Sequence, residues 1–243
     1  MTVHRSDEDA QPCLAPGSPG REPADRPAST PLLPPSLRAW LGLIAGLAAL
    51  GVLVLGVLYA GHSEPGRVDG WFVEPTADSV RPPWRYAALA TDFLGEPGGA
   101  ATLVVAAVTG CLLLRWPRAA VLVVAGAALT VGATTLLKPV VGRTIHGEGN
   151  LSYPSGHTAF LTALALVVAL LAAGRLGLGR AAALALVLAA ALVAGAAMGW
   201  AQVALGAHYP TDVLGGWCTA LAVVPATAWL VDRVADSRRH GRR

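Results

Sequence analysis

Two histidines and an aspartate supply the most reactive side chains of this sequence. His208 and Asp212 are four residues apart at the start of an apolar segment, and His157 follows the turn residues Tyr153–Gly156. Residues four apart share one face of a helix. A carboxylate bonded to one imidazole nitrogen fixes the tautomer and leaves the other nitrogen free as a nucleophile or base. The pair therefore suits nucleophilic catalysis, although a polar turn whose aspartate complements the helix dipole is an alternative interpretation.

Ser155, Gly156 and His157 precede a second apolar segment, where Pro154 and Gly156 indicate a turn. We expect a helix to begin at about Gly156. A helix N-terminus presents free backbone N–H groups and a partial positive charge, and both attract anions. Ser155 adds a hydroxyl donor, and His157 lies in the first helical turn. The alternative is a serine N-cap beside a histidine without a chemical role.

Lys138 and Arg143 lie shortly before this turn, and two fixed cations suit a phosphate. The alternative is a pair of basic side chains that extend to the membrane boundary. With both histidines and Asp212, they form a set that fits phosphoryl transfer through histidine. That reaction needs an in-line nucleophile, an acid for the leaving group and positive charge on the equatorial oxygens. No HExxH helix or carboxylate cluster accompanies them, so we predict neither a metal nor another cofactor.

The elements that must position these residues are long apolar blocks without charge. The sequence of 243 residues is 54% hydrophobic and only 14% charged, whereas soluble domains carry about 25% charged residues. A bilayer is crossed by about 20 apolar residues in a helix, and these blocks lack the polar face of a soluble helix. We therefore predict an all-α, polytopic membrane bundle of about six transmembrane helices. The blocks are Leu41–Gly61, Gly98–Leu114, Ala119–Leu137, Thr158–Ala173, Ala181–Trp200 and Val213–Val231.

The basic residues predict the orientation of this bundle. With the N-terminus in the cytoplasm, 13 of the 18 Lys and Arg residues fall on the cytoplasmic side, as the positive-inside rule requires. Both termini are then cytoplasmic, and the segments 138–157 and 201–212 face the extracytoplasmic side together. An outer segment before them is expected to form a short interfacial helix near Trp84–Leu94. Because basic residues sit at span ends, we expect no nucleic-acid partner.

Three regions follow from composition. Residues 1–37 hold eight of the 18 prolines and predict a disordered cytoplasmic tail. Residues 38–232 form the six-span membrane domain, and 233–243 form a basic cytoplasmic tail. High Ala, Gly and Arg content points to a bacterial plasma membrane, and nothing in the sequence predicts an oligomeric state.

At these positions the sequence resembles the type 2 phosphatidic acid phosphatase superfamily of membrane lipid phosphatases, which is related to vanadium-dependent haloperoxidases. The family carries the motifs K-x6-R-P, P-S-G-H and S-R-x5-H-x3-D. The second motif is complete at Pro154–His157, Lys138 opens the first, and His208 and Asp212 close the third with the family's spacing. The resemblance extends over most of the membrane region, from about Trp84 to Val231.

Two arginines of the family pattern are absent. The Arg-Pro positions of the first motif hold Ile145 and His146, and the Ser-Arg positions of the third hold Ala201 and Gln202. Arg143 lies two residues before the first gap, where many bacterial members have an additional arginine. Gln202 keeps a neutral hydrogen-bond donor at the second.

The resemblance implies a role for each matching residue. His208 would attack phosphorus and form a phosphohistidine, with Asp212 orienting it. His157 would protonate the departing alkoxide and then assist the attack of water. The residues expected to hold the phosphate oxygens are Lys138, Arg143, Ser155, Gly156 and Gln202.

The resulting hypothesis is metal-independent hydrolysis of a lipid phosphate or diphosphate at the outer membrane face. Polyprenyl diphosphate, phosphatidic acid, phosphatidylglycerol phosphate and other prenyl-linked phosphates are all candidate substrates. The alternative is a catalytically weakened member that binds a lipid phosphate or a protein partner without turnover, as the missing arginines suggest. A transporter would place polar residues at the span centres, and these centres are mainly Ala, Leu, Val and Gly.

Overall fold

The computed structural model describes residues 31–77 and 80–240, and every regular element in these ranges is a helix. The all-α prediction is therefore confirmed, and each of the six predicted apolar blocks lies largely within one helix. The elements are a 3₁₀ turn η1 (Pro35–Leu37), α1 (Arg38–Leu58), α2 (Arg67–Ala77), α3 (Trp84–Phe93), α4 (Pro97–Leu113), α5 (Pro117–Val141), α6 (Gly156–Arg175), α7 (Arg180–Ala204) and α8 (Pro210–His240).

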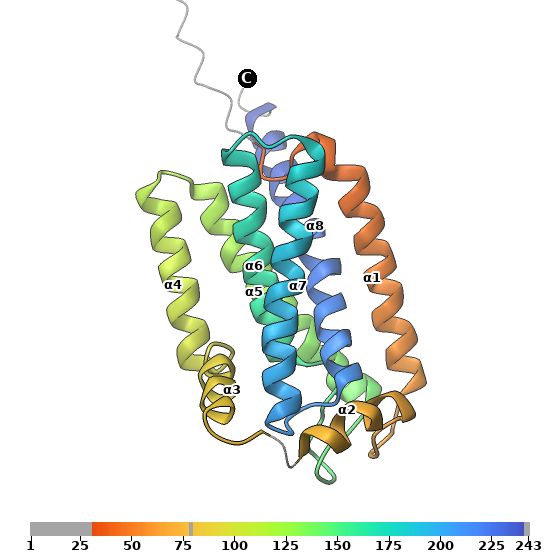
Figure 1. Cartoon of the computed structure of the whole chain (residues 1–243). Coiled ribbons are helices and arrows are strands. Elements are labelled where there is room, and N and C mark those ends of the chain that lie inside the picture. Colours follow the sequence, from red (N-terminus) through yellow and green to blue (C-terminus); the bar gives the residue numbers. More distant parts are fainter. Residues whose placement is uncertain (1–30, 78–79, 241–243) are drawn as a thin grey trace, which may run out of the picture. The chain divides into compact units, whose positions relative to one another are not determined.

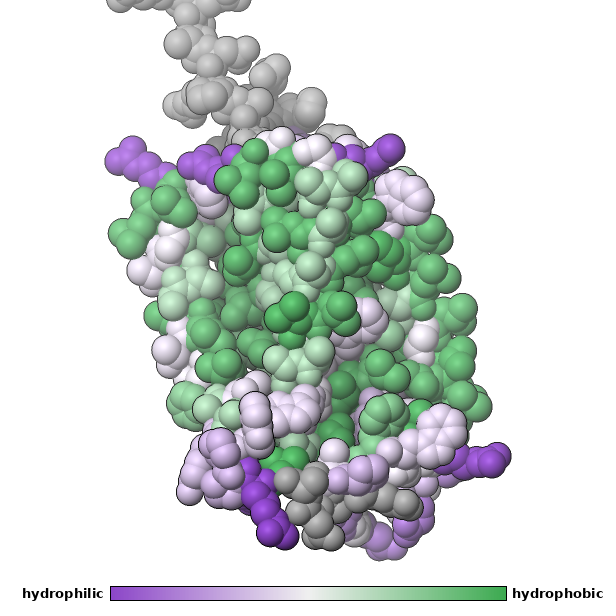
Figure 2. All heavy atoms as spheres, viewed as in Figure 1, coloured by the Kyte–Doolittle hydropathy of each residue, from purple (hydrophilic) through white to green (hydrophobic). Residues whose placement is uncertain are grey.

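Five of these helices are long and apolar enough to cross a membrane: α1, α5, α6, α7 and α8. The pair α3 and α4 is bent by 61° and gives a sixth span if it is counted as one. Figure 2 shows a broad apolar surface between two ends that carry the hydrophilic side chains. Helices satisfy their backbone polar groups internally, as the bilayer core requires. Because several helices are long and apolar enough to span it, the chain is a multi-pass membrane protein.

Helix α6 lies at the centre of the bundle and packs against α5, α7 and α8 (Figure 1). Its buried face includes Leu166, Val167 and Leu170. The facing helices bury small residues such as Ala183 and Ala191, which let helix backbones approach closely. Helix α1 packs mainly against α8. A rigid core thus supports the helix ends from which the reactive side chains extend.

Residues 31–37, which the sequence assigns to the N-terminal tail, contact helix α8. Leu32 and Leu33 are buried, and their backbone N–H groups each donate to the buried carboxylate of Asp232 at 3.0 Å. A buried charge needs such partners, which explains why residues 31–37 are ordered although their composition predicts a tail. Helix α8 likewise continues to His240, past the predicted boundary at 233. The rest of both predicted tails, 1–30 and 241–243, lies outside the described residues.

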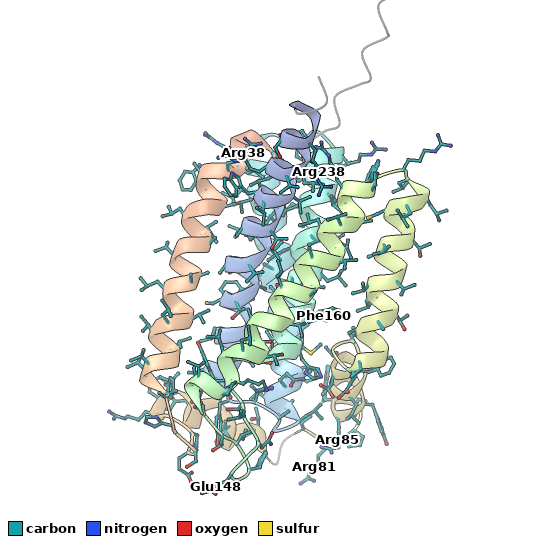
Figure 3. All side chains as sticks on the ribbon, turned by 180° about the vertical axis from the view of Figure 1, so that it is seen from behind. Arg38, Arg81, Arg85, Glu148, Phe160 and Arg238 are labelled. Atoms are coloured by element: carbon teal, nitrogen blue, oxygen red, sulfur yellow. The ribbon has the colours of Figure 1, made fainter. Side chains whose placement is uncertain are left out.

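One end of the bundle carries the short helices α2 and α3 (Figure 1). Arg81, Arg85 and Glu148 lie at this end, opposite Arg38 and Arg238 (Figure 3). The predicted short helix near Trp84–Leu94 is α3, whereas α2 was not predicted. The predicted polar segments between α5 and α6 and between α7 and α8 connect at this same end of the bundle.

Candidate active site

His208 lies in the turn between α7 and α8, and Asp212 lies in the first turn of α8. The Nδ1 atom of His208 is 3.7 Å from Oδ2 of Asp212, slightly beyond hydrogen-bond distance. That same oxygen accepts the backbone N–H of Tyr209 at 3.0 Å. Both side chains are buried. His208 therefore lies just before the helix that was predicted to hold both residues, and the carboxylate still lies beside Nδ1, on the side of the ring away from Nε2.

Burial lowers the pKa of His208, because a low-dielectric surrounding disfavours the charged imidazolium. Asp212 opposes this effect, while the positive charges of Lys138 and His157 add to it. The imidazole is accordingly neutral near pH 7, the form in which a ring nitrogen can attack an electrophile.

The N-terminus of α6 is hydrogen-bonded to the first turn of α8. Ser155 is the N-cap of α6 and its hydroxyl accepts the backbone N–H of Thr158 at 3.4 Å. The backbone N–H of Ser155 donates to the carbonyl oxygen of Asp212 at 2.9 Å. A Cβ on Gly216 would lie 2.2 Å from the Ser155 carbonyl oxygen, so only glycine permits this approach. The two predicted motifs therefore form one structural unit.

His157 occupies the first turn of α6 and faces two carboxylates. Its Nε2 lies 3.6 Å from Asp92 of α3 and 3.7 Å from Glu96, which precedes α4. Nε2 has no hydrogen-bond partner in the described part of the chain. Gly95 lies against the imidazole, and a Cβ there would be 2.3 Å from the ring. Ligand atoms of Asp92, Glu96 and His157 lie within 4.8 Å of one another, a grouping that can hold a metal ion and that the sequence did not predict.

The predicted phosphate ligands have different surroundings. Lys138 donates from Nζ to the carbonyl oxygen of Leu151 at 2.7 Å and remains partly exposed. Gln202 is buried and donates to Asp92 at 2.5 Å. Arg143 is also buried, and both of its terminal nitrogens bind carboxylates. The terminal nitrogens of Arg143 thus bind buried carboxylates, and the Gln202 amide binds the partly exposed carboxylate of Asp92.

Four polar residues contact predicted site residues but received no predicted role themselves: Asp69, Asp92, Glu96 and Thr211. Asp69 lies in α2 and binds both Arg143 and Thr211. In a chain with so little charge, acidic residues in an outer segment were a signal that merited attention. The spacing of four between Asp92 and Glu96 was a second signal.

Comparison with known proteins finds one family and one solved structure that are similar to this chain. A family model described as "PAP2 superfamily" matches residues 138–236. No curated protein sequence matches the chain. Among solved structures, a similar one is the transmembrane PAP2 type phosphatidylglycerolphosphate phosphatase from Bacillus subtilis, with a TM-score of 0.62 and 21% identity. The match covers 79% of this chain and 96% of that one, which shows a shared fold.

Proposed function

The chain belongs to the PAP2 superfamily through residues 138–236, and on that premise we propose that it hydrolyses the phosphate ester or diphosphate of a membrane lipid. The observation that carries this proposal is the buried imidazole of His208, held neutral by burial and backed by the Asp212 carboxylate at 3.7 Å. A neutral imidazole with one nitrogen facing a carboxylate has its other nitrogen free for attack.

The first step forms a bond between Nε2 of His208 and phosphorus. The bond between phosphorus and the lipid oxygen breaks, and His157 gives its proton to the departing alkoxide. Asp212 stabilises the positive charge that develops on the attacking ring. Lys138 and the N-terminus of α6 at Ser155 and Gly156 supply positive potential for the equatorial oxygens.

The second step releases inorganic phosphate. Water attacks the phosphohistidine, His157 accepts a proton from that water, and the bond between phosphorus and nitrogen breaks. His208 returns to the neutral form and His157 to the protonated form, so both groups are ready for another cycle. No metal is required in either step, although the group of Asp92, Glu96 and His157 makes chelation an informative arm of the test.

A lipid headgroup is the proposed substrate because the site lies at the end of an apolar bundle. Helices α2 and α3 at this end expose Trp71, Phe72, Trp84 and Tyr86, and aromatic side chains of this kind favour the membrane interface. The solved relative is named for phosphatidylglycerolphosphate, which therefore joins phosphatidic acid and polyprenyl diphosphate in the panel. The charge asymmetry of the sequence supports an extracytoplasmic position for this end.

A catalytically weakened binding protein is the second candidate. The specific observation in its favour is that Arg143 and Gln202 both bind carboxylates. Lys138 is then the one cationic side chain of the predicted set that binds no carboxylate in the described residues. Phosphate binding would depend on this lysine and the helix N-terminus, and turnover decides between the two candidates.

The test is phosphate release by the purified protein in detergent, with each lipid in EDTA and in Mg²⁺. His208→Ala is the critical variant, and His62→Ala is its matched control because His62 is an exposed histidine at the same end of the bundle. We expect release by the parent and the control in EDTA, and none by His208→Ala. Release that persists in His208→Ala would exclude the nucleophile, and absence of release from every lipid would favour the binding protein.

A further inference from the structure

Arg143 is enclosed on every side by groups of the protein itself. One terminal nitrogen donates to Thr211 Oγ1 at 2.6 Å and to Asp212 Oδ1 at 2.7 Å, and the other donates to Asp69 Oδ2 at 2.6 Å. The rings of Tyr59 and Tyr209 lie 4.2 and 4.6 Å from the guanidinium carbon. The remaining donor, Nε, is buried and has no partner in the described part of the chain. Little of this guanidinium is available to a phosphate.

Asp69 holds the far side of the same guanidinium. It is fully buried in the first turn of α2, and its Oδ1 accepts the backbone N–H of Thr211 at 2.9 Å. Its Oδ2 also accepts the backbone N–H of Gly66 at 3.1 Å. The Thr211 hydroxyl donates its single proton to Asp69 and accepts from Arg143. The Asp69 carboxylate therefore binds both Arg143 and Thr211, the residue that precedes Asp212.

Asp212 divides its two oxygens between Arg143 and His208. Oδ1 binds the guanidinium at 2.7 Å, whereas Oδ2 faces Nδ1 of His208 at 3.7 Å. A carboxylate held at Oδ1 cannot rotate freely, so the direction of Oδ2 is fixed. Alignment of a reacting group within about 1 Å is worth up to roughly 10²-fold in rate.

We infer that Arg143 is a positioning residue, which fixes the Asp212 carboxylate behind His208, and that Asp69 of α2 holds Arg143 in place. This inference rests on the proposed function for its kinetic consequence. Arg143, which lies two residues before the family arginine position at Ile145, then aligns the nucleophile. Phosphate binding is left to Lys138 and the α6 N-terminus. Helix α2 thereby becomes part of the catalytic unit.

The kinetic test compares Asp69→Asn and Arg143→Lys with Glu64→Gln and Arg67→Gln, which change exposed charges next to or within α2. We expect kcat of the first two to fall about 10- to 100-fold, with KM and the Kd of inorganic phosphate within about threefold of the parent. The controls keep parental values. If Arg143 binds phosphate directly, Arg143→Lys raises KM and the phosphate Kd at least tenfold, and Asp69→Asn leaves kcat unchanged or raises it. Either result overturns the proposal.

A second measurement is independent of turnover. ¹⁵N NMR of labelled imidazoles, assigned with His208→Gln, reports the tautomer of His208 in the parent and in each variant. We expect Nδ1 to carry the proton in the parent, and the two tautomers to mix in Asp69→Asn and Arg143→Lys. If the His208 tautomer is the same in these variants as in the parent, the inference is overturned, even if no lipid is hydrolysed. If the parent shows no turnover but the variants mix the tautomers, only the proposed function is overturned. Should these variants fail to fold, Thr211→Val removes one neutral hydroxyl from the same network and must give the same mixing.

Discussion

The two histidines of the site are held in opposite ways. On the His208 side, Asp69, Arg143 and Asp212 are fully buried and joined at 2.6–2.7 Å. On the His157 side, the imidazole and the Asp92 and Glu96 side chains are 29%, 22% and 51% exposed, and they meet at 3.6–3.7 Å. The first side is thus fully buried and hydrogen-bonded, whereas the second is partly exposed and leaves Nε2 of His157 without a hydrogen-bond partner in the described residues.

This difference matches what each side has to do in the proposed reaction. A nucleophile must keep one line of attack, so its support benefits from buried, fully bonded partners. An acid that protonates a leaving group and then activates water must exchange protons with its surroundings. The comparison predicts that changes on the His157 side reduce turnover alone, whereas changes on the His208 side also reduce stability.

Among the changes that compare the two sides, His157→Ala is expected to have the largest effect, a fall in kcat of about 10²–10⁴-fold for a lipid phosphate. The free energy of unfolding should change little, because partly exposed charge contacts contribute about 0–1 kcal/mol. The internal control is kcat/KM of an aryl phosphate with a good leaving group, because this constant reports formation of the phosphohistidine and departure of such a group needs no acid. An equal loss of kcat/KM for both substrates would contradict the role of His157 as the acid.

Arg143→Met should lower the free energy of unfolding by about 3–5 kcal/mol, because it leaves the buried carboxylates of Asp69 and Asp212 unpaired. Tryptophan fluorescence during denaturant unfolding in mixed micelles gives the measurement. The matched control is Arg85→Met, an exposed arginine on α3, which should stay within about 0.5 kcal/mol. A loss no larger than that of the control would show that the His208 side is not held by this network.

Two glycine substitutions sharpen the comparison at intermediate size. A Cβ on Gly216 would lie 2.2 Å from a backbone oxygen, so Gly216→Ala must move a helix and should lower the free energy of unfolding by about 1–3 kcal/mol. A Cβ on Gly95 would meet the His157 ring, which can rotate away. Gly95→Ala should therefore lower kcat about tenfold with little loss of stability. The opposite assignment of the two effects would reverse the description of the two sides.

The sequence predicted the helices of the bundle and the two histidines because both depend on local pattern. Long uncharged runs leave helices as the favoured structure, and the spacing of His208 and Asp212 by one helical turn is visible without a fold. The predicted helix start at Gly156 is confirmed, and Ser155 caps that helix through Thr158, as the alternative interpretation of this segment expects. The predicted catalytic roles of these residues remain predictions.

The partners of Arg143 could not be predicted, because they come from distant parts of the chain. Asp69 is 74 residues away, in a short helix that contains Pro75. Asp92 and Glu96 reach His157 through the 61° bend between α3 and α4. From the sequence alone, Arg143 is therefore expected to be a phosphate ligand. In the structure its guanidinium binds the buried carboxylates of Asp69 and Asp212.

The smallest expected effect is a shift of the pH profile. Burial lowers the pKa of His208, and protonation removes the lone pair that attacks phosphorus. The acidic limb of kcat/KM, which reports the free enzyme, should thus lie below the ordinary histidine value of about 6.5, with activity rising as pH increases through it.

The positive charge of Lys138 also lowers this pKa, so Lys138→Gln should move the limb to higher pH, toward 6.5. The second ionisation of the phosphate substrate, near pH 6, is measured separately by ³¹P NMR and subtracted. An acidic limb of kcat/KM above pH 6.5 in the parent, or its shift to lower pH in Lys138→Gln, would show that this limb does not report the buried imidazole of His208.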